Sequence, residues 1–414
     1  MNTRRVRMEA VDETARVTPI ELFFDLVFVF ALTQVTALMA DDLSGRGLLR
    51  GLLVLALVWW GWVGYSWLGN VVRADEGVVR LAMFGAMGAM FVLALTIPEA
   101  FDDLPGGLAG PVVFAVVYFA VRALHLAMFW VVSRGDPGLR RQLVHFTPSM
   151  LGGTALLLVA SQLDGLAQTL VWGATVLADY GGTLLGGSAG WRLYSPGHFA
   201  ERHGLILIVA LGESIVAIGV GVAALPISWP IILASMLGLV VAASIWWAYF
   251  DVVALVGERT LARASTQDRP RLARDSYSYL HLPMVTGVVL VALGMKKVLE
   301  YVGNPSEHQI TDPLTMLPLV ALYGGVVLYL LAHVAFRLRN LHSVNVQRVA
   351  VALALLAAVP LAAQMPALAA LALLAAVAAG LIIFEMTRYA DVRDRVRHVG
   401  EVAVSERQSH RSRE

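Results

Sequence analysis

The sequence contains no cysteine and few charged residues. Without cysteine, the chain cannot form disulfides, use a thiolate in catalysis, or bind zinc or an iron–sulfur cluster through sulfur. Charged residues make up 15% of the chain, whereas soluble globular proteins average about 25%. Because 58% of the residues are hydrophobic, the polar surface is too small to face water on all sides. We therefore expect lipid to surround most of the chain.

The motifs of several enzyme classes are also missing. The sequence has no HExxH helix, no Walker A loop, no GxSxG turn and no kinase signature. ATP-driven transport by this chain alone is therefore disfavoured, and we expect no cofactor. An intramembrane enzyme acting on a lipid or a lipid-linked substrate stays open as an alternative, because Asp, Glu and His side chains can bind a metal.

What the chain does have is a long series of apolar segments. A helix that crosses the hydrocarbon core needs roughly 20 apolar residues. Twelve segments meet or approach this length, and the fifth, sixth and eleventh are the shortest. The predicted fold class is therefore all-α, a polytopic transmembrane helical bundle. The expected spans are 19–40, 47–72, 78–98, 108–133, 142–160, 164–181, 203–223, 229–254, 276–301, 314–336, 346–363 and 366–387.

The basic residues predict the orientation of these spans. If the N-terminus is inside, 26 of the 31 Lys and Arg residues lie in or beside cytoplasmic segments and 4 lie at the outer side. Since Lys and Arg are enriched in cytoplasmic loops, we expect both termini in the cytoplasm. The longest inner loop is expected at 255–275. The expected partners are the lipid bilayer and a small solute, ion or proton, and not nucleic acid; the sequence does not define an oligomeric state.

Two stretches of the first half are similar to two stretches of the second. FVFALTQ (28–34) is similar to LIVALGE (207–213), and VWWGWVGYSW (58–67) is similar to IWWAYFDVV (245–253). The similarity is expected either from two parallel repeats of six spans or from chance among Leu-, Val- and Trp-rich helices. The repeat interpretation predicts a cytoplasmic segment 1–18, a first half 19–181, a connecting loop 182–202, a second half 203–387 and a charged cytoplasmic tail 388–414.

Two carboxylates lie near the start of the first span. Thr18 is placed to cap this helix, with Pro19 at its first position and Glu21 at its third, so Glu21 can close a capping box. Asp25 follows one turn later on the same face. Two carboxylates at this spacing repel unless a cation or a proton lies between them. Asp25 is predicted either to serve an ion or proton site or to form a structural bond between helices.

The seventh span carries the deepest carboxylate. Glu213 lies about 15 Å beyond His203 along a helix, near the membrane midplane, where a charged side chain costs about 2.5–3.5 kcal/mol on insertion scales. It is predicted to handle a proton or cation, or to form a buried structural hydrogen bond. Glu201 and Arg202 precede it at the expected membrane interface, where we expect them to anchor or cap the helix.

Further polar residues occur in the fourth, eighth and ninth spans. His281 lies about a turn and a half inside the ninth span, and Pro283 is expected to kink that helix. Asp251 ends the eighth span after an aromatic cluster, so an interface role and a site role are both open. Arg122 and His125 in the fourth span can neutralise a carboxylate.

The predicted depths of these residues suggest a pathway. Asp25, His203, Asp251 and His281 fall in the cytoplasmic third, and Glu213 lies deeper. Because ionisable residues inside a membrane are functional by default, these residues and Glu21 are predicted to form a substrate or ion pathway. We predict a secondary transporter or ion-conducting protein without catalytic residues. The alternatives are the intramembrane enzyme, for which metal binding is left open, and a non-catalytic membrane assembly factor.

Three stretches carry a resemblance to a known family. They are TPIELFFDLVFVFALTQ (18–34), ERHGLILIVALGESIVAIG (201–219) and YLHLPMVTGVVLVALG (279–294). Together they resemble the bacterial low temperature requirement A (LtrA) family, and they lie in both halves of the chain. The resemblance implies a multispan protein of the bacterial inner membrane. It implies no catalytic residues.

Overall fold

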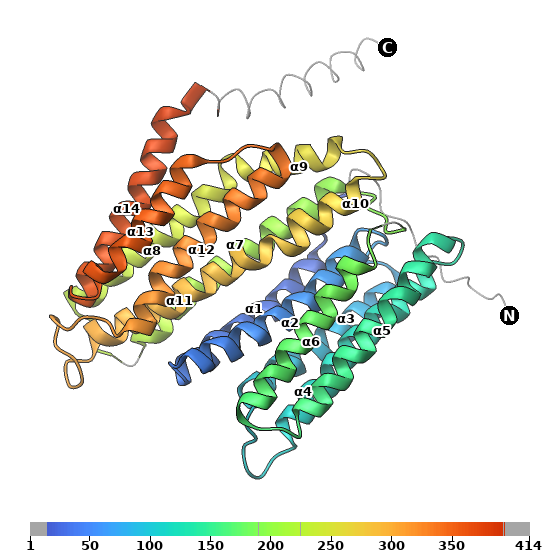
Figure 1. The fold of residues 1–414 in the computed structure, drawn as a ribbon, viewed down its shortest axis with the longest axis horizontal. Coiled ribbons are helices and arrows are strands. Elements are labelled where there is room, and N and C mark those ends of the chain that lie inside the picture. The colour runs from blue at the N-terminus through green and yellow to red at the C-terminus, as the bar shows by residue number, and fades with distance from the viewer. Residues whose placement is uncertain (1–14, 189, 224, 392, 394–414) are drawn as a thin grey trace.

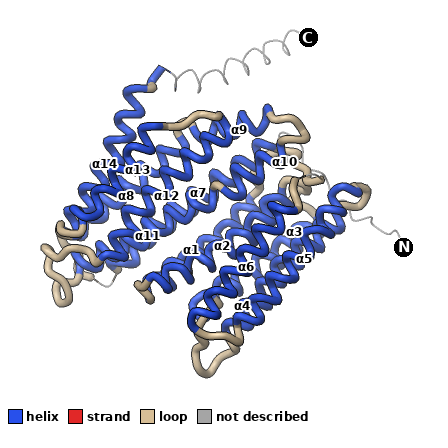
Figure 2. The backbone as a smooth tube through the Cα atoms, viewed as in Figure 1, coloured by secondary structure: helices blue, strands red, loops and turns tan. Residues whose placement is uncertain are grey.

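The computed structural model describes residues 15–188, 190–223, 225–391 and 393. These residues form helices joined by short loops, and no β-strand occurs among them (Figure 2). The all-α prediction is therefore confirmed. Most of the predicted cytoplasmic segment 1–18 and of the predicted tail 388–414 lies outside the described residues.

The first group of helices contains the six expected from the sequence. They are α1 Pro19–Asp41, α2 Gly45–Gly69, α3 Gly77–Leu95, α4 Gly110–Val132, α5 Pro137–Ala160 and α6 Gly165–Leu185, with a short 3-10 turn at Ile97–Glu99. The start of α1 is as predicted, because Thr18 occupies the N-cap position and Pro19 is the first helical residue.

The second group contains eight helices. They are α7 Pro196–Val222, α8 Trp229–Phe250, α9 Val253–Arg263, α10 Arg269–Leu272, α11 His281–Gly303, α12 Met316–Leu341, α13 Val346–Ala362 and α14 Ala367–Arg388. Helices α6 and α7 extend into the predicted connecting segment, so the residues between them are 186–195.

Ten helical segments among the described residues are long and apolar enough to cross a membrane. One of them joins α8 to α9, and another joins α10 to α11. The apolar helix α13 has 17 residues and is shorter than this standard, and α6 is not in the set. These two helices match the sixth and eleventh predicted spans, which are among the shortest. The chain is thus a multi-pass helical bundle.

The predicted inner loop 255–275 is mostly helical, so it is not an irregular segment. Most of it forms α9 and α10, and a π-helical turn at Ala273–Tyr279 continues directly towards α11. Leu261 and Tyr277 are fully buried, because the apolar faces of these segments pack against the bundle. Helical structure therefore continues without a break from Arg269 to the start of α11.

The two groups lie side by side, with their long helices running in a common direction (Figure 1). Helices α1 and α2 of the first group contact α7 and α11 of the second. Within the first group α1 packs on α2 and α3, α3 on α4, α4 on α5, and α6 on α5 and α2. Within the second, α7 packs on α8 and α11, α11 on α12, α12 on α13, and α14 on α13 and α8. This matching order of contacts supports the interpretation as a repeat, while the domain boundaries remain a prediction.

Candidate functional site

An arginine on α7 joins the two carboxylates of α1. Arg202 donates from Nη1 to Glu21 Oε1 at 2.9 Å and from Nη2 to Asp25 Oδ1 at 2.8 Å. The two carboxylates lie one helical turn apart, so one guanidinium can reach both. All three side chains are at most 1% exposed. The cluster therefore links the first group of helices to the second through buried charge.

Glu21 makes three further kinds of contact. The backbone N of Thr18 donates to Glu21 Oε2 at 2.9 Å, as the predicted capping box requires, and Thr18 Oγ1 donates to the same oxygen at 2.9 Å. His198 Nε2 lies 3.1 Å from Oε1 and 3.0 Å from Oε2. A Cβ atom added to Gly69 would lie 2.3 Å from Glu21 Oε1, so only glycine leaves room for this carboxylate.

Asp25 is held from a second side by α2. Trp62 Nε1 donates to Asp25 Oδ1 at 2.7 Å, and the Arg202 guanidinium lies 5.5 Å from the Trp62 ring centroid. Asp25 Oδ2 is buried and has no hydrogen-bond partner among the described residues. One carboxylate oxygen of the cluster thus remains available to a proton or another donor.

The charges of the cluster do not balance by themselves. Glu21 and Asp25 bring two negative charges when both are ionised, and Arg202 brings one positive charge. A buried charge without a partner is unstable. One additional proton, on Asp25 or on His198, makes the cluster neutral. The arrangement can therefore bind and release a proton or exchange it for a cation.

Two other predicted residues lie beside this cluster. The His203 ring is centred 5.1 Å from Trp62 and 5.2 Å from His281. His203 Nδ1 lies 2.8 Å from Phe199 O, and its Nε2 is buried without a partner among the described residues. Tyr249 Oη lies 2.9 Å from His281 Nε2. The structure therefore brings Glu21, Asp25, His203 and His281 into one region.

Glu213 and Asp251 lie elsewhere. Glu213 follows Arg202 by eleven residues on α7, about 16 Å along the helix, and accepts a hydrogen bond from Thr33 Oγ1 of α1. Asp251 caps the C-terminal end of α8 and lines a separate cavity. The expectation that Arg202 anchors the helix at the membrane interface is wrong, because this side chain is completely buried.

Sequence reasoning missed His198, Trp62 and the role of Arg202. A signal was present, because His198 and Arg202 are spaced four residues apart, as are Glu21 and Asp25. Two acidic and two basic residues with the same spacing on two helices can pair face to face. Nothing in the sequence placed those helices in contact.

A second buried ion pair lies within the first group of helices. Arg122 Nη2 on α4 lies 3.7 Å from Asp179 Oδ1 on α6, and Tyr118 donates to the other oxygen of Asp179. The prediction that a basic residue of α4 neutralises a carboxylate is confirmed for Arg122 but not for His125, whose ring nitrogens have no hydrogen-bond partner among the described residues. Over the described ranges, no group of three His, Asp or Glu side chains is arranged to hold a metal ion.

Comparisons with known proteins agree with the resemblance found in the sequence. The model of the family described as "Bacterial low temperature requirement A protein (LtrA)" matches residues 16–383. A relative from Rhizobium meliloti (strain 1021), described as "Uncharacterized protein RA0937", is 30% identical over 307 residues, which cover 71% of this chain and 72% of that protein. No solved structure matches the chain.

Proposed function

The chain belongs to the bacterial low temperature requirement A family, and from that premise we propose that it moves protons or another cation across a membrane. It acts as a secondary transporter or an ion-conducting protein. The observation that carries this proposal is the buried cluster of Glu21, Asp25 and Arg202, with carboxylates on one group of helices and the guanidinium on the other.

Protonation of this cluster is coupled to the contact between the two groups. With Asp25 ionised, separating it from Arg202 leaves a buried charge unpaired, which costs about 3–5 kcal/mol. With Asp25 protonated, this cost falls because the charge has been removed. A proton on Asp25 therefore weakens the contact between α1 and α7, which the Glu21–Arg202 ion pair still holds, and its release strengthens that contact. That coupling is what a carrier with two alternating states requires.

The pathway includes His203, His281 and Glu213 but not Asp251, which lines a separate cavity. His203 lies next to Trp62, which binds Asp25, and His281 lies next to His203. They accept the proton between the cluster and the membrane surface. Glu213 takes up the proton at a deeper position on α7, where it also contacts α1 through Thr33.

The membrane and the orientation follow from the charge distribution. We place the chain in the bacterial inner membrane with both termini in the cytoplasm, because the basic residues concentrate on that side. The cluster then lies in the cytoplasmic third, since α1 and α7 begin on that side.

The test is a measurement of current on proteoliposomes adsorbed to a solid-supported membrane. A rapid change of external pH is expected to give a current with wild-type protein and none with Asp25→Asn. Glu300→Gln is the matched control, because Glu300 is partly exposed and pairs with Lys297 at 2.8 Å. Equal currents for wild type and Asp25→Asn, with both proteins folded, would contradict the proposal.

A further inference from the structure

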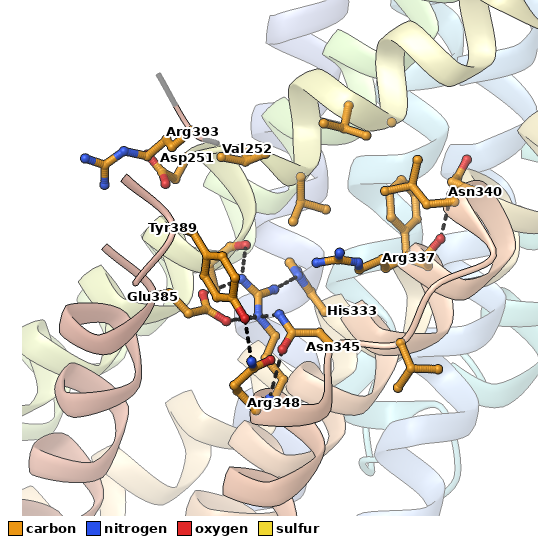
Figure 3. Close-up of a pocket in the computed structure, with 18 of the residues that line it drawn as sticks. Asp251, Val252, His333, Arg337, Asn340, Asn345, Arg348, Glu385, Tyr389 and Arg393 are labelled. Atoms are coloured by element: carbon orange, nitrogen blue, oxygen red, sulfur yellow. Dashed lines mark hydrogen bonds and ion pairs between the residues drawn. The ribbon is translucent and has the colours of Figure 1, made fainter. Parts of the chain in front are cut away.

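A cavity of about 670 Å³ opens among the ends of α8, α12, α13 and α14 (Figure 3). Small-molecule sites in proteins usually have volumes of about 300–1,000 Å³. Glu21, Asp25 and Arg202 do not line this cavity. It is therefore a separate place in the fold, and the proposed cation pathway does not account for it.

The charged groups around the cavity are unevenly paired. Three arginines and two carboxylates line it, namely Arg337, Arg348, Arg393, Asp251 and Glu385. Arg348 is already neutralised, because its Nε and Nη2 donate to Glu385 at 3.0 and 2.9 Å. Arg337 forms no ion pair with any described carboxylate. The lining thus carries an excess of positive charge that favours an anion.

One nitrogen of the Arg337 guanidinium is paired, and its two Nη groups are left to bind a ligand. Its Nε donates to Ser343 Oγ at 3.0 Å, which leaves both Nη groups to donate elsewhere. Arg337 is exposed and follows the buried His333 by one helical turn on α12, and both residues line the cavity (Figure 3). Two parallel N–H donors of this kind match two oxygens of a phosphate.

A buried acceptor accompanies this donor. Asn340 Nδ2 donates to Ser276 Oγ at 3.0 Å and to Phe336 O at 2.7 Å, so the amide orientation is fixed. Asn340 Oδ1 is buried without a partner among the described residues, and Asn340 lines the cavity. A buried unpaired acceptor costs about 1–3 kcal/mol. Because this oxygen has no accessible surface, a ligand in the cavity does not reach it, and Asn340 instead fixes the wall of the cavity through its two donated bonds.

Part of the remaining lining is apolar. Val252, Val253 and Val256 line the cavity at α9, and Val344 and Val346 line it at the turn between α12 and α13. Val344 and Val346 are exposed. A ligand with only polar groups would leave these surfaces uncovered, so the occupant needs an apolar part as well.

We propose that this cavity binds an amphiphile with an anionic phosphate headgroup. The two Nη groups of Arg337 bind the phosphate oxygens, and the valines contact the apolar part. Two sources supply this headgroup chemistry: an anionic phospholipid such as phosphatidylglycerol, and a soluble glycerol phosphate. The site does not depend on the proposed cation transport.

Native mass spectrometry of the full chain, purified and stripped of lipid in detergent, tests the proposal. Phosphatidylglycerol is the probe, phosphatidylcholine is the control lipid, and sn-glycerol 3-phosphate is the soluble competitor. Arg337→Gln is expected to weaken phosphatidylglycerol binding about tenfold or more, as the loss of a charge-assisted bond implies, and Arg337→Lys to weaken it less. Arg141→Gln, which removes an exposed arginine of α5, is expected to bind as wild type does.

A second variant tests the cavity itself. Val344→Trp places a large ring in the mouth and is expected to lower binding without removing any charge. Displacement by sn-glycerol 3-phosphate would support the soluble form of the headgroup, and its failure to displace would support the lipid. Equal affinity of wild type and Arg337→Gln for phosphatidylglycerol, or equal affinity of wild type for both lipids, would overturn the proposal. Unchanged melting temperatures confirm that the variants are folded.

Discussion

Arg202 Nη2 on α7 donates to Asp25 Oδ1 on α1 at 2.8 Å, and neither side chain is more than 1% exposed. The two residues are 177 positions apart in the sequence and belong to different groups of helices. A bond of this kind is strong only while both partners stay charged and together. It therefore makes the contact between the two groups sensitive to a single proton.

Removing the cation of the cluster should destabilise the protein. Arg202→Gln leaves Glu21 and Asp25 buried without their guanidinium, at a cost of about 3–5 kcal/mol. Thermal unfolding in detergent is expected to show a lower melting temperature. In the double variant with Asp25→Asn the loss should be smaller than the sum of the two single losses, because one unpaired charge has also gone. Strict additivity would show that the two side chains are not coupled.

Trp62 is expected to stabilise ionised Asp25 through the hydrogen bond that its indole N–H group donates. Trp62→Phe keeps an aromatic ring but removes the donor to Asp25 Oδ1, which should cost about 1.5–3 kcal/mol for a bond to a charged group. The pH dependence of the current is expected to shift, because the ionised form of Asp25 has lost a donor. Trp59→Phe is the control, since Trp59 Nε1 donates to Ser278 O at 2.8 Å and not to the cluster. The same shift in both variants would count against a specific role for Trp62.

Gly69 should tolerate no side chain. Gly69→Ala brings a Cβ atom to 2.3 Å from Glu21 Oε1, so Glu21 must move, and overpacking of this kind costs about 1–3 kcal/mol. We expect a lower melting temperature and a smaller current. Gly88→Ala on α3 is the matched control, because nothing lies within 4 Å of its added Cβ and alanine favours a helix by about 1 kcal/mol. A stable, fully active Gly69→Ala protein would mean that Glu21 is not held as described.

Glu213 is predicted to be a second carboxylate that takes up and releases the transported proton. Glu213→Gln keeps an oxygen that can accept from Thr33 Oγ1 but cannot carry a proton at neutral pH. The current after a pH change is therefore expected to fall while the melting temperature stays near that of wild type. Thr33→Val, which removes only the hydroxyl, is expected to retain current. An unchanged current in Glu213→Gln would place the pathway away from this carboxylate.

Local features of the helices could be predicted from the sequence. Contacts between residues far apart in the sequence could not. The start of α1 follows from Thr18 and Pro19, whose effects act within one helical turn. The positions of the long helices follow from hydrophobic length. Arg202 was misjudged because its depth was inferred from its place near the helix start. In the structure, α7 begins at Pro196 and carries Arg202 inside the bundle.

The 255–275 segment shows the same limit. Its basic residues indicate a cytoplasmic position, but they do not determine whether the segment is a loop or a helix. Leu261 lies within this segment and is fully buried, and Tyr277, just beyond it, packs on Phe199 of α7 and Phe336 of α12. The cavity with Arg337 and Asn340 was missed for a similar reason, since its walls come from α8, α9, α12, α13 and α14.

The central claim is that Asp25 takes up a proton while the cluster holds the two helix groups together. Infrared difference spectroscopy of protein labelled with ¹³C-aspartate measures this directly. Acidification of wild-type protein is expected to produce a band of a protonated, labelled carboxyl group that is absent from Asp25→Asn and present in Asp312→Asn, which alters a partly exposed aspartate outside the cluster. The same set of bands in wild type and in Asp25→Asn would contradict the account.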